Sequence, residues 1–142
     1  MSFKFSTRSK RNLRNVKAKV FMLADRSLQE SAHDFGIPND GGYRTALDQN
    51  KLFTSGRGVT SKDGFIRKSY HQSGLAFDMY YYDGSKANWE DTGKYKEIAK
   101  TVRKVFDAMK KEGIFEANEF LIWGGDWKKA DLPHFQISKK NV

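Results

Sequence analysis

Two short stretches of the chain concentrate side chains that could bind a metal ion. Residues 69–78 hold a hydroxyl group, the imidazole of His71 and the carboxylate of Asp78. Asp78 lies in a strongly aromatic run, where a buried carboxylate is costly unless a cation meets it. Residues 131–136 supply a further carboxylate and the imidazole of His134. Two histidines and one aspartate make a three-ligand zinc set that leaves a coordination position for water.

Two more groups would complete a hydrolytic site. Asp131, three residues before His134, can place a second carboxylate beside an attacking water. Arg44 precedes a good helix N-cap at Thr45, so its guanidinium group could hold a substrate carboxylate or an oxyanion near that helix end. It could equally pair with a surface acid. Each spacing is common by itself, and only the combination supplies the parts that hydrolysis at zinc requires.

Composition bounds the class of protein. The 142 residues suffice for one domain with a substantial core, and 38% hydrophobic content with three tryptophans indicates a folded chain. There is no cysteine, which excludes disulfide frameworks and thiolate metal sites, so any zinc must be held by imidazole and carboxylate groups. No repeat, low-complexity tract or linker is visible. We therefore expect a single domain over residues 1–142.

The net charge of +9 predicts attraction to a polyanion. Nucleic acid, anionic lipid and the acidic polymers of a bacterial wall all qualify, and charge alone does not choose among them. No stretch reaches the ~20 apolar residues of a membrane span, so membrane insertion is not expected. The first residues lead at once into a basic polar segment without the apolar core of a secretory signal, which predicts synthesis in a cytosol.

Residues 9–30 are predicted to form one amphipathic helix, because apolar residues recur near helical spacing. They are Leu13, Val16, Val20, Leu23, Ala24 and Leu28. The basic residues around them either bind a polyanion or form an ordinary solvated face, and the lack of interleaved aromatic residues favours the solvated face. His33, just past this helix, is expected to be a loop residue and not a ligand.

Apolar periodicity and turn signals predict the remaining elements. They are a short strand over residues 35–43 interrupted by a turn, a helix over 46–54, a surface loop over 56–68 that could cover a cleft, a strand over 75–82, a helix over 92–112 ended by Gly113, and strands over 120–123 and 134–137. In the last strand His134 and Gln136 share one face. The order predicts an α+β domain, with a small antiparallel sheet packed with about three helices.

Three motifs together resemble a known enzyme family. They are Ser69-x-His71-x-x-Gly74-x-Ala76-x-Asp78, Asp131-x-x-His134, and Gly42-Tyr43-Arg44-Thr45 followed by Gln49. This set is similar to the signatures of the D-alanyl-D-alanine carboxypeptidase group of LAS zinc metallopeptidases, which share a fold with the hedgehog signalling domain. Over nearly the whole chain, the sequence looks most like the L-alanyl-D-glutamate peptidases that tailed phages use as endolysins.

The resemblance implies a role for each motif residue. His71, Asp78 and His134 would hold one zinc ion, and Asp131 would be the catalytic base. Arg44 would act in catalysis and in substrate binding, since it could stabilise the oxyanion or anchor a stem-peptide carboxylate. Ser69 and Gln49 would also bind the substrate.

The function implied is hydrolysis of the peptide stem of bacterial peptidoglycan for host cell lysis, at the L-alanyl-D-glutamate bond. The enzyme would be a monomer, made in the host cytoplasm and acting on the wall in the periplasm after release, without a separate wall-binding module. No specific nucleic-acid partner is expected.

Three other functions compete with this one. A D-alanyl-D-alanine carboxypeptidase would release a terminal alanine. A basic nucleic-acid-binding module would explain the charge, and would bind DNA in a salt-sensitive way without changing peptidoglycan. A zinc-stabilised binding protein without catalysis is the third, and the presence of Asp131 argues against it.

Overall fold

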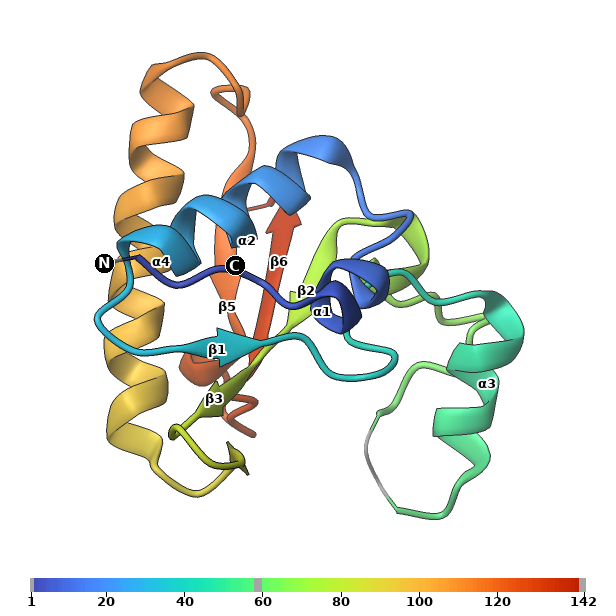
Figure 1. Ribbon diagram of the computed structural model, residues 1–142. Coiled ribbons are helices and arrows are strands. Elements are labelled where there is room, and N and C mark those ends of the chain that lie inside the picture. Colours follow the sequence, from blue (N-terminus) through green and yellow to red (C-terminus); the bar gives the residue numbers. More distant parts are fainter. Residues whose placement is uncertain (1, 58–59, 141–142) are drawn as a thin grey trace.

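The computed structural model describes residues 2–57 and 60–140, which fold into an α+β arrangement (Figure 1). The helices are α1 (Thr7–Asn12), α2 (Ala18–Glu30), α3 (Ala46–Thr54) and α4 (Thr92–Lys111), with short 3-10 helices η1 (Tyr70–Ser73) and η2 (Gly124–Asp126). The strands are β1 (Phe35–Gly36), β2 (Ala76–Asp78), β3 (Tyr80–Tyr82), β4 (Ala87–Asn88), β5 (Phe120–Trp123) and β6 (His134–Ser138). The predicted α+β class is confirmed.

The strands form two small antiparallel sheets, where the sequence predicted one. The first has the order β1-β3-β4 and the second the order β2-β6-β5. In the second sheet Asp78 lies opposite His134 and Phe77 lies opposite Phe135. Because side chains alternate along a strand, the phenylalanines lie on the core face, where their rings stack with centroids 5.2 Å apart. Asp78 and His134 therefore share the opposite face.

The core lies between the second sheet and two helices. α2 packs across α4 (Figure 1). Both helices contribute fully buried apolar side chains. α4 carries the apolar stripe that the sequence predicted, from Tyr95 through Ile98 and Val102 to Met109. α3 stands apart, at the far side of the molecule from α4. Within residues 2–57 and 60–140, no helix is both long and apolar enough to cross a bilayer.

The prediction of one helix over residues 9–30 is wrong. The chain forms α1 and α2, joined by a turn in which Asn15 has a φ of 70°. The Lys17 backbone N–H donates to the carbonyl of Gly74 at 2.9 Å, and the Asn12 side-chain amide donates to the carbonyl of Ile37 at 2.8 Å. These tertiary hydrogen bonds override the local helical pattern.

The prediction of one strand over residues 75–82 is also wrong. β2 and β3 belong to different sheets, and the buried Met79 between them donates its backbone N–H to the carbonyl of Pro133 at 3.0 Å. The predicted strand over residues 35–43 shortens to β1. The loop over residues 56–68 contains no helix or strand in its described part, and residues 58 and 59 lie outside the described residues.

Candidate metal centre

Asp78 and His134 reach the site because they are cross-strand partners. They end β2 and begin β6, and the antiparallel register sets them directly opposite each other. Directly opposed residues in such a pair have their Cβ atoms close enough for side-chain contact. Accordingly, Nδ1 of His134 lies 2.9 Å from Oδ1 of Asp78.

His71 is positioned by the short helix η1, which the Ser69 side chain caps. Ser69 Oγ accepts the backbone N–H of His71 at 3.2 Å, and the Gln72 side chain accepts the backbone N–H of Ser69 at 2.9 Å. This reciprocal capping box fixes the start of the helix. The Nε2 atom of His71 then lies 3.4 Å from Oδ1 of Asp78.

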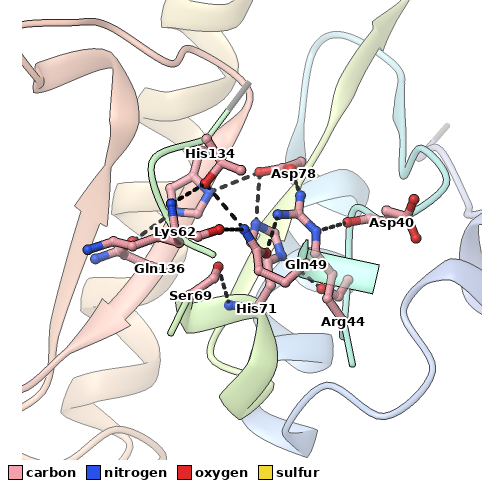
Figure 2. A network of polar contacts seen from close by, with 11 residues as sticks. Asp40, Arg44, Gln49, Lys62, Ser69, His71, Asp78, His134 and Gln136 are labelled. Carbon is pink, nitrogen blue, oxygen red and sulfur yellow. Dashed lines mark hydrogen bonds and ion pairs between the residues drawn. The ribbon is translucent and has the colours of Figure 1, made fainter. Parts of the chain in front are cut away.

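The three side chains offer one ligand atom each within a small volume. Nitrogen and oxygen donors of His71, Asp78 and His134 all lie within 4.8 Å of one another, and Figure 2 shows them pointing together. The His71 and His134 side chains are only 3% and 8% exposed. Such a set of two imidazoles and one carboxylate matches the preferences of zinc.

Outer contacts orient each ligand, which is the arrangement expected around a metal. Nδ1–H of His71 donates to the carbonyl of Gly42 at 2.8 Å, which leaves the Nε2 lone pair facing the cluster. Nε2–H of His134 donates to Oε1 of Gln136 at 2.8 Å, which leaves Nδ1 for the cluster. Arg44 Nη2 donates to Oδ2 of Asp78 at 3.0 Å, so Oδ1 faces the histidines. These residues fit a zinc ion.

The segment that carries Gly42 and Arg44 is hydrogen-bonded to the backbone of the candidate ligands Asp78 and His71. The carbonyl of Gly41 accepts the backbone N–H of Asp78 at 2.7 Å, and the backbone N–H of Arg44 donates to the carbonyl of His71 at 3.2 Å. A side chain at Gly42 would place its Cβ 2.1 Å from the carbonyl oxygen of Asn12. Only glycine therefore allows this backbone to approach α1 and still reach His71.

The ionisation of Asp78 and that of the two histidines influence one another. Burial alone would raise the pKa of Asp78, but the charge of His71 and hydrogen bonds from His134 and His71 lower it far below its usual range. Burial alone would lower the pKa of His134, but its hydrogen bond to Asp78 and the charge of Asp78 raise it above 6.5. In the metal-free protein, His134 thus keeps both ring protons to higher pH than an ordinary histidine.

This coupling predicts how pH affects zinc binding. A zinc ion that bound Nδ1 of His134 would have to displace a proton whenever the pH lies below the raised pKa. We expect the apparent zinc affinity to fall by about tenfold per pH unit in that range, since one proton competes with one ion. The fall should begin above pH 6.5, the ordinary imidazole value. Competition with a chromogenic chelator between about pH 8 and about pH 5.5 measures this, and a flat affinity down to about pH 6 would contradict it.

Asp131 stands in the wall of the cavity that contains the three ligands. Although the residue as a whole is exposed, partial withdrawal of its carboxyl group from water raises the pKa of Asp131, and the negative charge of Asp78 adds to this. Its backbone N–H donates to the carbonyl of Gly124 at 2.8 Å, and the same carbonyl accepts the backbone N–H of Trp127 at 3.2 Å. Gly124 therefore closes the base of the loop that presents Asp131.

A side chain at Gly124 is expected to displace this loop. Its Cβ would lie 2.3 Å from the carbonyl oxygen of Asp131 and 3.1 Å from the Cβ atoms of Asp131 and His134. We expect Gly124→Ala to destabilise the fold by about 1–3 kcal/mol. Peptidase activity should fall further, by ~10²-fold, because small displacements of reacting groups have large kinetic effects.

Thermal unfolding and turnover of the same preparations test this expectation. Gly93→Ala is the matched control, because the nearest atom to its added Cβ is 3.6 Å away. The control should keep wild-type activity. Equal activity in the two variants would show that the loop tolerates a side chain at Gly124.

Of the other predicted site residues, Arg44 and Ser69 line the cavity and Gln49 does not. Arg44 lines the cavity, but it is already engaged by Asp78, by Gln49 at 3.1 Å and by the carbonyl of Asp40 at 2.7 Å. Ser69 also lines the cavity, while its hydroxyl caps η1.

Gln49 is fully buried, and its amide nitrogen donates to Thr60 Oγ1 at 3.2 Å and to the carbonyl of Lys62 at 2.9 Å. It supports the cavity from beneath and is not placed to touch a substrate.

The cavity has a volume of about 950 Å³, large enough for a peptide segment. Thr60, Ser61 and Lys62 form one wall, in agreement with a loop beside a cleft. Trp127 from the other wall contacts His134, with ring centroids 5.1 Å apart. Sequence reasoning assigned no site role to Trp127, Gln136 or the Gly42 carbonyl. Of these three, only Gln136 could have been identified from the sequence, because strand alternation sets it on the same face as His134.

Comparisons with known proteins agree with one another. Residues 1–141 match the family model described as phage L-alanyl-D-glutamate peptidase. The chain is 32% identical over 143 aligned residues to the L-alanyl-D-glutamate peptidase of Escherichia phage T5, covering 98% of this chain and 92% of the relative. It is also similar to the crystal structure of the Serratia marcescens L-Ala D-Glu endopeptidase ChiX. That match has a TM-score of 0.73 and 28% identity, and it covers 96% of this chain and 91% of the other.

Proposed function

Because the chain belongs to the phage L-alanyl-D-glutamate peptidase family, we propose that it is a zinc-dependent endolysin that hydrolyses the peptide stem of bacterial peptidoglycan. The bond cut is that between L-alanine and D-glutamate. One observation carries the proposal: in a chain of this family, His71, Asp78 and His134 converge within 4.8 Å inside a peptide-sized cavity. The peptidase class follows from the family, and the zinc requirement is the proposed part.

His71 Nε2, Asp78 Oδ1 and His134 Nδ1 are proposed as the ligands of one zinc ion. When bound, zinc would polarise the scissile carbonyl and lower the pKa of a water molecule in the site. The hydrogen bonds from His71 to Gly42 and from His134 to Gln136 keep the ligating nitrogens in the required tautomers.

Asp131 is proposed as the general base and acid. Its raised pKa makes its carboxylate a better proton acceptor than an ordinary aspartate. It would take a proton from the attacking water and return that proton to the leaving nitrogen of glutamate. Arg44 has N–H groups beyond the three that bind Asp78, Gln49 and Asp40, and these would face the carbonyl oxygen as charge develops on it.

We also propose the setting in which this chemistry takes place. The relatives named as L-alanyl-D-glutamate peptidases support action on the cell wall. In a phage context this means synthesis in the host cytoplasm and access to the wall after release into the periplasm. The positive charge of the chain would favour its association with acidic wall polymers.

Mass spectrometry of muropeptides after digestion of purified peptidoglycan tests the proposal. An endopeptidase of this kind should release stem fragments that begin with glutamate and leave alanine on the sugar. Chelation should stop the reaction, and added zinc should restore it. Release of terminal alanine alone would indicate a D-alanyl-D-alanine carboxypeptidase. Unchanged muropeptides together with salt-sensitive retention on DNA would indicate a nucleic-acid-binding module.

A further inference from the structure

The lining of the cavity includes two side chains that present hydrogen-bond donors. Lys62 and Gln136 both line the cavity, one from the loop wall and the other from β6. In Figure 2 the side chain of Lys62 runs past His134 toward Gln136. Among residues 2–57 and 60–140, no hydrogen bond or ion pair engages the Lys62 ammonium group or the Gln136 amide nitrogen.

The orientation of the Gln136 amide follows from its neighbour. Nδ1 of His134 faces Asp78, so Nε2 carries a proton and must donate to an oxygen. That oxygen is Oε1 of Gln136, at 2.8 Å. The amide NH₂ group therefore points away from His134, and it can only donate.

Lys62 is held in place at its backbone. Its carbonyl accepts from the buried Gln49 amide at 2.9 Å, and its N–H donates to Thr60 Oγ1 at 3.0 Å. Gln49 also binds Arg44, so the loop wall is tied to the same network as the ligand Asp78. The ammonium group is thus carried on an anchored backbone beside the reaction site.

We propose that Lys62 and Gln136 form a subsite for the free carboxylate of the substrate's glutamate residue. The inference rests on the proposed function and adds a substrate preference, namely for stem peptides whose glutamate carboxylate is free and negatively charged. A glutamate within a peptide has two carboxyl groups, of which only one continues the chain. The other is an anion at neutral pH, and an ammonium together with an amide NH₂ group is a matching pair of donors.

The balance of charge in the cavity supports an anionic ligand. Arg44 and Asp78 neutralise each other as an ion pair at 3.0 Å. The remaining lining includes Arg57, Lys62 and Lys129 against Asp40 and Asp131. The subsite would therefore favour stem peptides with a free glutamate carboxylate over stem peptides in which that group is a carboxamide.

Two synthetic stem peptides that differ only at this group test the subsite. One carries the glutamate carboxylate and the other carries the primary carboxamide. For the wild-type enzyme we expect kcat/KM to be ~10-fold higher for the carboxylate, mainly through KM, as expected for one charge-assisted hydrogen bond. Lys62→Met should lower kcat/KM for the carboxylate peptide only, and the preference should fall to about 1.

A second variant and a control complete the test. Gln136→Glu keeps an oxygen for His134 Nε2–H but replaces the NH₂ donor with a negative charge, so it should reverse the preference toward the carboxamide. Lys104→Met removes the same charge from the exposed surface of α4 and should keep the wild-type preference.

The proposal is overturned if the wild-type enzyme cuts both peptides equally, an outcome that leaves the proposed function intact. It is also overturned if Lys62→Met slows both peptides alike, since Lys62 would then have only a structural role. Loss of the preference in Lys104→Met would assign it to long-range charge and reject the subsite. If neither peptide is cut, the proposed function and the subsite fail together.

Discussion

Asp78→Asn is expected to remove zinc from the protein and abolish hydrolysis. The carboxylate is the only negatively charged group among the three proposed ligands, and a neutral amide is a poor zinc ligand. The loss of affinity should exceed the ~10–100-fold that follows loss of an outer-shell partner. The substitution also leaves Arg44, whose side chain is 11% exposed, without its ion-pair partner. We expect this to destabilise the fold by about 2 kcal/mol, less than for a fully buried pair.

Metal analysis of purified variants measures this directly. The wild-type protein should hold about one zinc ion per chain, and His71→Ala and His134→Ala should lose it as Asp78→Asn does. His33→Ala is the matched control, because His33 pairs with Glu97 away from the cavity. Full zinc occupancy in both His71→Ala and His134→Ala would refute the assignment of these ligands.

Much of this centre could be predicted because short-range rules dictate it. His134 and Gln136 share a face by strand alternation, and β5 occupies the residues predicted for it. α4 begins where predicted and ends within one residue of its predicted end, because its apolar stripe is long and regular. The motif containing His71 and Asp78 predicted which side chains meet. The pairing of Asp78 opposite His134 could not be predicted from the sequence, because no local sequence pattern indicates which distant strands pair or in which register.

The failures share a physical cause. A hydrogen bond from Lys17 to the carbonyl of Gly74 ends what the local pattern would continue as a helix. Met79 turns the chain from one sheet to the other, although residues 75–82 have the composition of a single strand. The resemblance implied substrate binding for Gln49, whereas the structure shows it buried, with hydrogen bonds to Arg44 and to the carbonyl of Lys62. In each case a partner distant in the sequence decides the outcome, and composition does not reveal that partner.

Asp131→Asn is expected to separate catalysis from metal binding. Asp131 lines the cavity but is not part of the cluster of ligand atoms, so zinc should stay bound. Asparagine preserves the size of the side chain, and the backbone hydrogen bond from residue 131 to Gly124 does not depend on the side chain. Only the ability to accept and return a proton is lost. We therefore expect wild-type zinc content and a wild-type fold, with hydrolysis slowed by the ~10²–10⁴-fold typical of a lost general base.

The matched control is Asp126→Asn, which makes the same chemical change five residues earlier. Asp126 pairs with Arg103 on the surface and does not line the cavity, so this variant should turn over stem peptides at the wild-type rate. Zinc content, thermal unfolding and turnover should be measured on the same preparations. If Asp131→Asn lost zinc while Asp78→Asn kept zinc and near-normal rates, the two aspartates would have exchanged roles. If Asp131→Asn kept both zinc and activity, the proton would have to travel through another group in the cavity.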